Sequence, residues 1–539
     1  MIIPEFYNTL THHIAPLKPS RPGPDPQDPL NGAEITLYSC GPTVYDYAHI
    51  GNFRSFLFAD LLRRYLEIRG AVVRQVMNMT DVGHMTDDQI ADGAGRDKLE
   101  LAVEKMKENK KTGRALVENP NDPFQVADFF IQAFQQDALT LRLQVVMDHH
   151  AAPEAEKENI MPRPTRHIGE FISLIRTLIS RGHAYVGSDG VVYFDVGSFP
   201  DYGALSGNSV DQLAHGAGGR TNEQAAKRHP ADFFLWKPDQ KHIMRWPSPW
   251  GDGYPGWHVE CSSMAMSILG ESLDIHTGGE DNIFPHHECE IAQSQCATGR
   301  PFVHLWMHAR HLMVNGEKMS KSKGNFFTIR DLVEKGYDPL VVRYALLAAR
   351  YRETLNFTLK GLHEAAAAIT TLRDLAEKLL LAVAGVDEAA GDGLPSTRTA
   401  LSQLAQTLDP ADLDMLTEFD RALAEDLNIS AALAAVFIWA PPLLKQKTIG
   451  FPRARSALLA LKRVDHVLQV AFPPVLPFDP AKLADIESLL AGRNAARAAR
   501  DFVQSDAFRR QLLALGVELK DTPAGTTWRR CLAPAVPPA

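Results

Sequence analysis

Hydrophobic and polar positions between residues 34 and 79 follow two different periods. The runs at 34–39 (EITLYS) and 72–79 (VVRQVMNM) predict strands, whereas apolar residues recur at helical spacing through 53–70. A strand, a helix and a second strand joined in this order form a crossover unit, which builds a parallel sheet. The sequence therefore predicts an α/β fold whose loop at 40–52 lies at the carboxyl edge of the sheet.

The pattern changes again further along the chain. Residues 146–255 combine helical, strand-like and Gly-rich stretches without a clear repeat, which indicates an insertion into the sheet. Strand-like runs at 272–276 and 308–314 then predict that the sheet resumes on either side of a helix beginning near Pro285. An Ala- and Leu-rich helical pattern over 362–470 predicts a helical bundle.

These changes of pattern divide the chain into predicted segments. The ranges are 1–31 for a Pro-rich N-terminal extension, 32–145 and 256–325 for the two halves of the α/β domain, 146–255 for the insertion, 326–361 for a connecting region, 362–470 for the bundle and 483–530 for a small basic C-terminal domain. The prolines between residues 16 and 29 predict an extended stretch without a core of its own, so that folding starts after it.

Composition narrows the class of protein. With 539 residues, 45% hydrophobic and 22% charged, the chain has the proportions of a soluble protein of several domains. We find no apolar run of the roughly 18 residues that a membrane helix needs and no signal-peptide pattern, which predicts a cytoplasmic protein without a membrane partner. The net charge of −9 excludes a globally basic nucleic-acid binder, and five scattered cysteines argue against a disulfide framework.

Two motifs could bind phosphate. Ala48-His49-Ile50-Gly51-Asn52 lies where the predicted loop meets the helix, and a helix amino end favours anions. KMSKSKGN at 318–325 offers three lysines within six residues, which can reach a triphosphate. A structural turn and a solvated charged loop are the alternative interpretations. Neither a P-loop nor a G-x-G-x-x-G fingerprint occurs, so a nucleotide would have to be held by these two motifs.

Cysteine, histidine and glutamate side chains offer a possible metal site. His286 and Glu290 are four residues apart on one predicted helix and share a face. Together with Cys40 and Cys261 they would supply two thiolates, one imidazole and one carboxylate, which suit tetrahedral Zn²⁺. Their long separations mean that spacing alone does not assemble this site. We assign the other three cysteines to the hydrophobic core: Cys289, Cys296 and Cys531.

In combination these motifs resemble those of the class I aminoacyl-tRNA synthetases, and within that class the cysteinyl-tRNA synthetase family. AHIGN and KMSKS resemble the two class signatures, while CGPTVYD, GWHVECS, DIHTGGED and FPHHECEIAQS resemble segments specific to the cysteine family. The similarity continues through PRPTRHI and AEDLNISAAL to DTPAGTTWR and covers nearly the whole chain.

The resemblance implies a Rossmann-like catalytic domain split by a connective insertion, a stem-contact region at 326–361, an α-helical bundle and an anticodon-binding domain at 483–530. It implies one Zn²⁺ per chain on Cys40, Cys261, His286 and Glu290, and Mg²⁺ with ATP. The implied roles are catalysis by His49, Lys318 and Lys321, ATP binding by His49, Gly51, Asn52 and Lys321, and substrate binding by Trp257, His258, His276 and Asp281.

Two residues depart from the family pattern. Asn52 replaces the second histidine of the first signature, which removes a possible phosphate donor. Cys289 stands between metal ligands where Asn is common, which leaves open whether it competes for metal. We assign no role to residues 81–120.

The implied reaction activates L-cysteine with ATP to cysteinyl-adenylate and transfers the cysteinyl group to the 3′-terminal adenosine of tRNA-Cys, with zinc selecting the thiol. One alternative is a ligase of the same fold that joins cysteine to an amino sugar, which the anticodon-like tail disfavours. A metal-dependent RNA-binding module and a zinc oxidoreductase are the others, and both leave the paired signatures unexplained.

The C-terminal segment is locally basic. Between Arg493 and Arg530 we count eight basic and four acidic residues, and Trp528 could stack on an unpaired base. The predicted tRNA contacts are Arg493, Arg497, Trp528 and Arg529. Removal of residues 483–539 is expected to impair tRNA charging and to spare cysteine activation, and a monomer is predicted.

Overall fold

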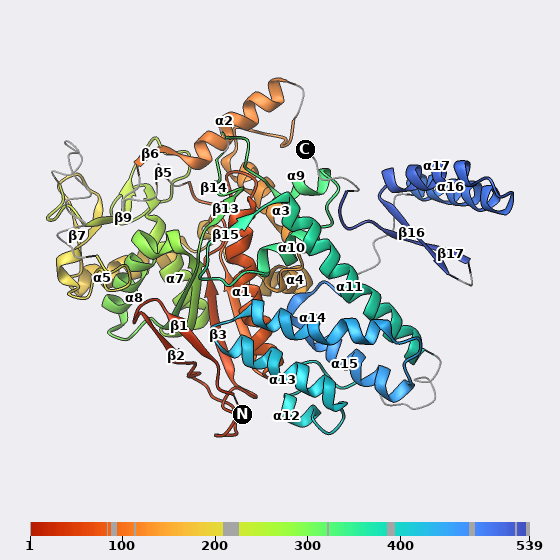
Figure 1. Cartoon of the computed structure of the whole chain (residues 1–539). Coiled ribbons are helices and arrows are strands. Elements are labelled where there is room, and N and C mark those ends of the chain that lie inside the picture. The colour runs from red at the N-terminus through yellow and green to blue at the C-terminus, as the bar shows by residue number, and fades with distance from the viewer. Residues whose placement is uncertain are drawn as a thin grey trace.

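The predicted parallel sheet lies at the centre of the N-terminal half of the molecule (Figure 1). In this computed structural model its strands lie in the order β12 (Val303–Ala309), β11 (Leu273–Gly279), β3 (Glu34–Ser39) and β4 (Val72–Met77), and each neighbouring pair is parallel. The structure describes residues 2–83, 85–87, 94–112, 115–208, 226–320, 323–384, 394–473, 480–522 and 525–534.

Two separate cores form on the two faces of this sheet. Alternate residues of β3 divide between them, with Ile35 and Leu37 in one core and Tyr38 in the other. The first core includes α1 (Ile50–Ile68) and continues into the helical bundle. The second includes α7 (Trp257–Leu269) and α8 (Glu288–Thr298). Both faces of the sheet are therefore covered, as is usual for a parallel sheet.

The sequence between the two halves of the sheet forms a second sheet. Its antiparallel strands lie in the order β10 (Gly253–Pro255), β9 (Phe233–Pro238), β8 (Val192–Phe194) and β7 (Ala184–Val186). Helix α5 (Ile168–Ser180) presents its apolar side to the same core as α7 and α8.

Two expected elements differ from the sequence prediction. The strand-like run at 308–314 is divided, because His311 donates its N–H to a Glu280 carboxylate oxygen and β13 (Leu312–Val314) pairs with β15 (Leu355–Phe357) in another sheet. The helix expected near Pro285 begins with a π turn over Ile283–His287 that is kinked at Phe284, whose backbone angles are not helical, and regular α8 starts at Glu288.

The N-terminal extension also differs from expectation, because it contributes to the core. The hairpin of β1 (Glu5–Asn8) and β2 (His13–Pro16) fixes Phe6 against Tyr65 of α1, and Phe6 is fully buried. At the end of β1, Thr9 donates its N–H to the carbonyl of Trp306 on β12 over 2.8 Å. The extension is therefore held against one edge of the sheet.

Helices predominate in the C-terminal half. The bundle consists of α11 (Leu359–Val383), α13 (Pro410–Ala424), α14 (Ile429–Lys445) and α15 (Phe451–Leu468), and Figure 1 shows it on the α1 side of the sheet. None of the helices in the described ranges has both the length and the apolar character of a membrane span.

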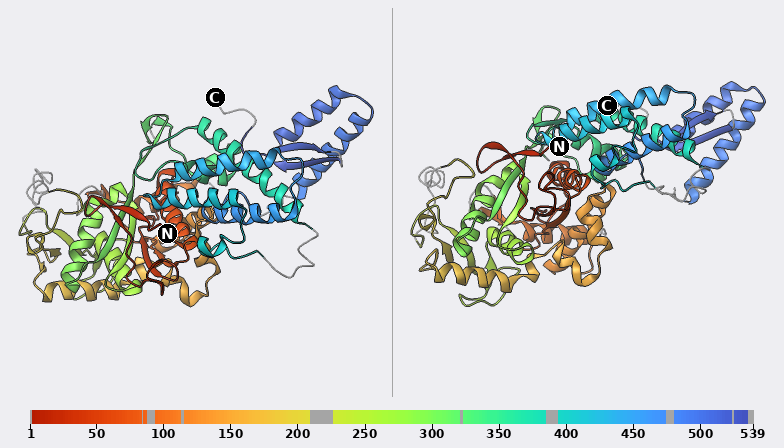
Figure 2. Two further views of the ribbon diagram at one scale, coloured as in Figure 1. Left: turned by 60° about the horizontal axis from the view of Figure 1, so that its bottom comes forward. Right: turned by 90° about the horizontal axis from the view of Figure 1, so that it is seen from below.

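A small domain follows the bundle. It packs α16 (Pro480–Ala498) and α17 (Phe502–Ala514) on a hairpin of β16 (Val517–Thr522) and β17 (Gly525–Arg530). Both views in Figure 2 show this domain projecting away from the rest of the molecule. Ion pairs connect it to α11, where Arg529 lies 2.6 Å from Asp374.

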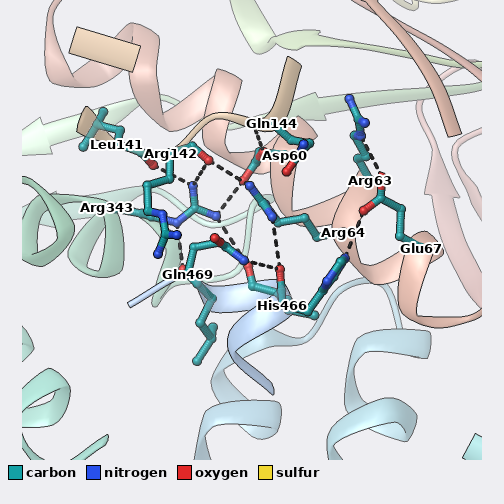
Figure 3. Close-up of polar contacts among 12 residues, drawn as sticks. Asp60, Arg63, Arg64, Glu67, Leu141, Arg142, Gln144, Arg343, His466 and Gln469 are labelled. Atoms are coloured by element: carbon teal, nitrogen blue, oxygen red, sulfur yellow. Dashed lines mark hydrogen bonds and ion pairs between the residues drawn. The ribbon is translucent and has the colours of Figure 1, made fainter. Parts of the chain in front are cut away.

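A buried network of charges joins α1 to the bundle (Figure 3). Asp60 accepts from Arg64 of its own helix over 2.8 Å and from Arg343 of α10 (Pro339–Leu347) over 2.6 Å. Arg343, fully buried, also donates to the carbonyls of Leu141 and Leu468 at the ends of α3 (Pro123–Thr140) and α15. Because helix C-termini carry partial negative charge, these carbonyls help to balance the two guanidiniums.

Candidate active site and metal centre

The predicted zinc ligands meet at the carboxyl edge of the parallel sheet. Cys40 follows the last residue of β3 and donates its N–H to Thr277 of β11 over 3.1 Å. The four ligand atoms of Cys40, Cys261, His286 and Glu290 all lie within 4.8 Å of one another, and all four residues are buried.

Three separate elements bring these side chains to Cys40. Cys261 lies on α7, His286 in the π turn and Glu290 on the first turn of α8. Although the helix is irregular at its start, His286 Nε2 lies 3.0 Å from Glu290 Oε1, as expected for residues four apart. The contact predicted between His286 and Glu290 is therefore present although the start of the helix is irregular.

The charges of this cluster do not balance. Burial and the nearby Cys261 and Glu290 raise the pKa of the Cys40 thiol well above its usual value. Burial opposes ionisation of Cys261, but its contacts with Cys40 and His286 lower its pKa to about 6. Glu290 is also buried, and His276 and His286 hold its pKa at about 2. Two thiols cannot both ionise here unless a further positive charge is present.

A divalent cation would supply this positive charge, and the donor set fits Zn²⁺. Two sulfurs, an imidazole nitrogen and a carboxylate oxygen are the donors that tetrahedral zinc prefers, and the cluster offers them in a buried position. The residues present therefore fit the predicted metal.

A second, overlapping group could also hold a metal ion. It shares Cys40 and Glu290 with the first group and replaces the other two ligands by His276 and His287. His276 Nε2 lies 3.2 Å from Glu290 Oε2, and His287 Nε2 lies 3.1 Å from Cys40 Sγ. Sequence reasoning missed His287, although its position directly after His286 was a signal.

A further histidine that the sequence prediction missed lies behind this group. His308 of β12 places its Nε2 2.8 Å from His287 Nδ1. Burial, with the neighbouring His276, lowers the pKa of His308 to about 3, and burial likewise lowers the pKa of His287 well below its usual value. His308 is the first residue of the run predicted as a strand at 308–314, whereas in the structure it lies near the carboxyl end of β12.

The predicted substrate residues surround the ligands. The Trp257 ring stacks on the His286 ring with 4.2 Å between centroids, and His258 Nδ1 lies 3.0 Å from His286 Nδ1. His276 is fully buried beside Glu290, whereas Asp281 is exposed in the short helix of residues 280–282 that follows β11. Their roles in binding substrate stay predictions.

His49 and Asn52 form a reciprocal cap at the start of α1. Asn52 donates its backbone N–H to His49 Nδ1, and His49 donates its own to the Asn52 side-chain oxygen, each over 3.1 Å. Asn52, which stands where the signature has its second histidine, therefore completes a capping box with His49. Because Nδ1 accepts a hydrogen bond, the neutral His49 ring carries its proton on Nε2.

The first signature motif lies against the chain that follows the second. Ile50 donates its N–H to the carbonyl of Phe327 over 3.0 Å, and a Cβ on Gly51 would lie 3.0 Å from the His49 ring and 3.2 Å from Met319 Cε. The His49 ring, more than the second motif, leaves little room for a side chain at position 51. Lys318 is exposed at the end of β14 (Glu317–Lys318), while Lys321 lies outside the described residues.

The predicted tRNA contacts are partly engaged within the C-terminal domain. Arg493 is buried and donates to both carboxylate oxygens of Asp521, which Arg497 also contacts over 2.7 Å. Trp528 packs on the small core of the domain, and Arg529 pairs with Glu518 and with α11. The contacts of these residues with RNA stay predictions. Arg493 is less available for such a contact, because it is buried and paired with Asp521.

Cys289 faces away from the metal ligands. It is fully buried, and its sulfur lies 3.3 Å from the hydroxyl of Tyr202. Neither of the two possible ligand groups among the described residues includes it. The sequence assignment of Cys289 to the core agrees with this position.

Comparisons with known proteins extend over the whole chain. A family model described as "tRNA synthetases class I (C) catalytic domain" matches residues 26–367, and another described as "Cysteinyl-tRNA ligase anticodon binding domain" matches 479–529. The cysteine–tRNA ligase of Salinibacter ruber is 40% identical over 97% of this chain and 98% of its own length. That of Chlorobaculum tepidum is 39% identical, with the same coverage.

One solved structure supports the fold. Mycobacterium tuberculosis methionyl-tRNA synthetase bound by methionyl-adenylate superposes with a TM-score of 0.51 at 15% identity, covering 84% of this chain and 94% of that one. At this identity the likeness concerns the fold alone.

Proposed function

Since the chain belongs to the class I cysteine–tRNA ligase family, we propose that it activates L-cysteine with ATP at the carboxyl edge of the sheet and transfers it to the 3′ end of tRNA-Cys. The observation that carries this proposal is the buried group of Cys40, Cys261, His286 and Glu290, whose first member directly follows the strand that the loop of residues 41–49 connects to α1. A proposed site for a thiol at the end of β3 and a proposed site for phosphates at the start of α1 are thus joined by one loop.

The phosphates of ATP are proposed to bind at the start of α1. The helix dipole favours anions there, and the His49 ring carries its proton on Nε2, where it can donate to a phosphate oxygen. Lys318 and Lys321 of the second signature would approach the same phosphates, with Mg²⁺ bound to the nucleotide. Because the substrate carboxylate attacks phosphorus directly, positioning and charge stabilisation are the main tasks of these residues.

The substrate side chain is proposed to bind at the four ligands. When held there, Zn²⁺ would supply the positive charge that ionises a thiol and binds its sulfur. Trp257 stacks on His286 and so keeps that imidazole in place, while Glu290 neutralises charge on the opposite side. Asp281, at the end of β11, is proposed to bind the substrate ammonium group.

The C-terminal domain is proposed to bind the anticodon of the tRNA. It matches the anticodon-binding family model and projects from the body, where a long RNA could reach it (Figure 2). We propose that the enzyme acts as a monomer in the cytoplasm.

Two assays on the same full-length preparation test the function. Cysteine-dependent exchange of pyrophosphate into ATP is expected, which neither an RNA-binding module nor an oxidoreductase would give. Charging of tRNA-Cys with cysteine is expected as well. Exchange without charging, together with transfer of cysteine to an amino sugar, would instead support the sugar ligase.

Discrimination against serine tests the role of the metal. A hydrophobic pocket separates substrates that differ by one small group by only about 1–3 kcal/mol, whereas a 10⁴-fold preference requires roughly 5.5 kcal/mol. We expect kcat/KM in pyrophosphate exchange to favour cysteine over serine by at least about 10⁴. Comparable values for the two amino acids would contradict the proposed thiol–metal contact.

A further inference from the structure

The chain crosses back from the C-terminal domain to the body of the molecule after β17. Cys531 still belongs to the domain, because it donates its N–H to the carbonyl of Gly516, just before β16, over 2.8 Å. One residue later the contacts change side. The carbonyl of Leu532 accepts the N–H of Asp338, at the start of α10, over 2.9 Å. We call residues 532–534 the return segment.

Apolar side chains of the return segment pack on the body. Leu532 and Ala533 lie against the first core, which includes α1 and the bundle. Pro534 reaches the turn between α9 (Ile329–Glu334) and α10, where a Cβ placed on Gly336 would lie 3.8 Å from the proline Cβ. Apolar residues of α16, α17 and the hairpin form a small core of their own. The return segment therefore supplies apolar contact between the domain and the body.

Exposed ion pairs also hold the domain on the body. Lys520 Nζ lies 3.0 Å from Glu377 Oε2, and Arg529 lies 2.6 Å from Asp374, both on α11. These four side chains are about one-third to one-half exposed, so water and salt weaken the attraction. The return segment instead makes apolar contacts and a backbone hydrogen bond. Its contribution therefore persists as the salt concentration rises.

Asp338 is a well-fixed point of attachment. Its carboxylate accepts the N–H of Leu340 as the cap of α10, over 2.7 Å, and lies 3.5 Å from Arg373 of α11. The same helix α10 carries Arg343, which donates to Asp60 of α1 in the buried network (Figure 3). The return segment is thus attached to a part of the body that is joined firmly to α1, the helix whose amino end is proposed to bind ATP.

We propose that the return segment is a positioning element for tRNA. It holds the C-terminal domain at a fixed place on the body, so that an RNA bound to the domain presents its other end to the start of α1. This inference rests on the proposed function, because it takes the domain as a part that binds RNA. A domain without this attachment would have to be ordered when the RNA binds, and that ordering weakens binding.

Removal of the return segment from the otherwise complete chain tests this role. Deletion of residues 532–539 leaves Cys531 and its bond to Gly516 in place. Deletion of 535–539, which lie outside the described residues, is the matched control because it keeps the return segment. We expect KM for tRNA-Cys in aminoacylation to rise roughly 10-fold in the first variant and to stay near the wild-type value in the second. Pyrophosphate exchange should be unchanged in both.

Two further substrates and variants separate positioning from damage to the domain or to the body. A minihelix that contains only the acceptor stem of tRNA-Cys is too short to reach the domain, so its kcat/KM should be the same in the wild type and in the 532–539 deletion. Deletion of residues 483–539 removes the whole domain, and its KM for tRNA-Cys should rise further. Small-angle X-ray scattering should show a larger radius of gyration for the 532–539 deletion than for the 535–539 deletion.

A point variant makes the same test without shortening the chain. Leu532→Asp places a charge against the apolar core, whereas Leu532→Met keeps the contact at similar volume. We expect KM for tRNA-Cys to follow the 532–539 deletion in Leu532→Asp and the wild type in Leu532→Met. An unchanged KM for tRNA-Cys in both the deletion and Leu532→Asp would overturn the proposal, and so would an equal loss with the minihelix. Absence of pyrophosphate exchange in the wild type would instead contradict the proposed function.

Discussion

Two buried clusters of ionisable side chains in this molecule differ in how their charges are compensated. Around Asp60, two arginines meet one carboxylate and the carbonyls at two helix ends, so the cluster is complete within the protein (Figure 3). Around Cys40, two thiols lie close to the Glu290 carboxylate, and burial together with the neighbouring Cys261 and Glu290 raises the pKa of Cys40. Burial alone therefore does not distinguish a structural cluster from a functional site. The distinguishing feature is a charge that no neighbouring group compensates.

The largest effect is expected from breaking the incomplete cluster. Cys261→Ala removes a ligand, so we expect metal content near zero and pyrophosphate exchange lower on the order of 10³-fold, since a catalytic metal contributes several kcal/mol. Elemental analysis after dialysis and exchange kinetics measure both. Cys289→Ala is the matched control, because this buried cysteine contacts Tyr202, and it should keep its metal. Metal retained in Cys261→Ala contradicts the ligand assignment.

Breaking the complete cluster should affect stability instead. Asp60→Ala leaves Arg64 and Arg343 buried without their carboxylate, which typically costs about 3–5 kcal/mol. Urea unfolding followed by circular dichroism measures the loss, and metal content per folded molecule should not change. Asp148→Ala, which removes a partly exposed partner of Arg63, serves as the control and should cost much less. Equal losses for both would show that Asp60 is not the centre of the network.

The pH dependence of stability should sharpen the same distinction. Against the cost of burial, Arg64 and Arg343 lower the pKa of Asp60 to about 2, and His466 and Arg63 do the same for Glu67. Both pKa values lie below those of the unfolded chain. Their contribution, about 2 kcal/mol for Asp60, is therefore complete above about pH 4.5 and is lost as pH falls toward 2.

Unfolding midpoints measured between pH 6 and pH 3 test this dependence. The wild type should lose stability steeply below pH 4, while Asp60→Asn should be less stable at neutral pH and respond less to acid. A variant with the same acid response as the wild type would show that Asp60 does not titrate as expected.

The smallest effect is expected at an exposed pair. Arg529 and Asp374 connect the C-terminal domain to α11, but both side chains are about one-third exposed. Asp374→Ala should therefore change the melting temperature little, in keeping with about 0.2–1 kcal/mol for such pairs, and should leave metal content and pyrophosphate exchange unchanged. A loss of stability as large as that of Asp60→Ala would show that this exposed pair contributes as much to stability as the buried network.

Sequence reasoning predicted the parts of the fold that depend on local pattern. The period of apolar residues located β3, α1 and β4, and the crossover rule gave their parallel order. It misplaced elements decided by distant partners. The run at 308–314 is divided because His311 binds Glu280 and β13 finds β15, and neither partner is visible in the local pattern.

The sequence predicted only some of the residues in the candidate site. Cys40, Cys261, His286 and Glu290 came from a family resemblance, since the distances between them in sequence exceed any spacing rule, and the structure brings them together. Thr9 and His308 escaped notice because a threonine in a turn and a histidine in a strand are common. Their side chains come into contact only because the hairpin of residues 5–16 lies against β12.

The wide spacing of the proposed ligands in the sequence also means that they are synthesised at different times during translation. Cys40 leaves the ribosome 250 residues before Glu290, and the strand that carries His308 follows later still. At about 5–20 residues per second, that gap lasts roughly 10–50 s. A metal ion bound by all four ligands could therefore be captured only after more than half of the polypeptide has been made.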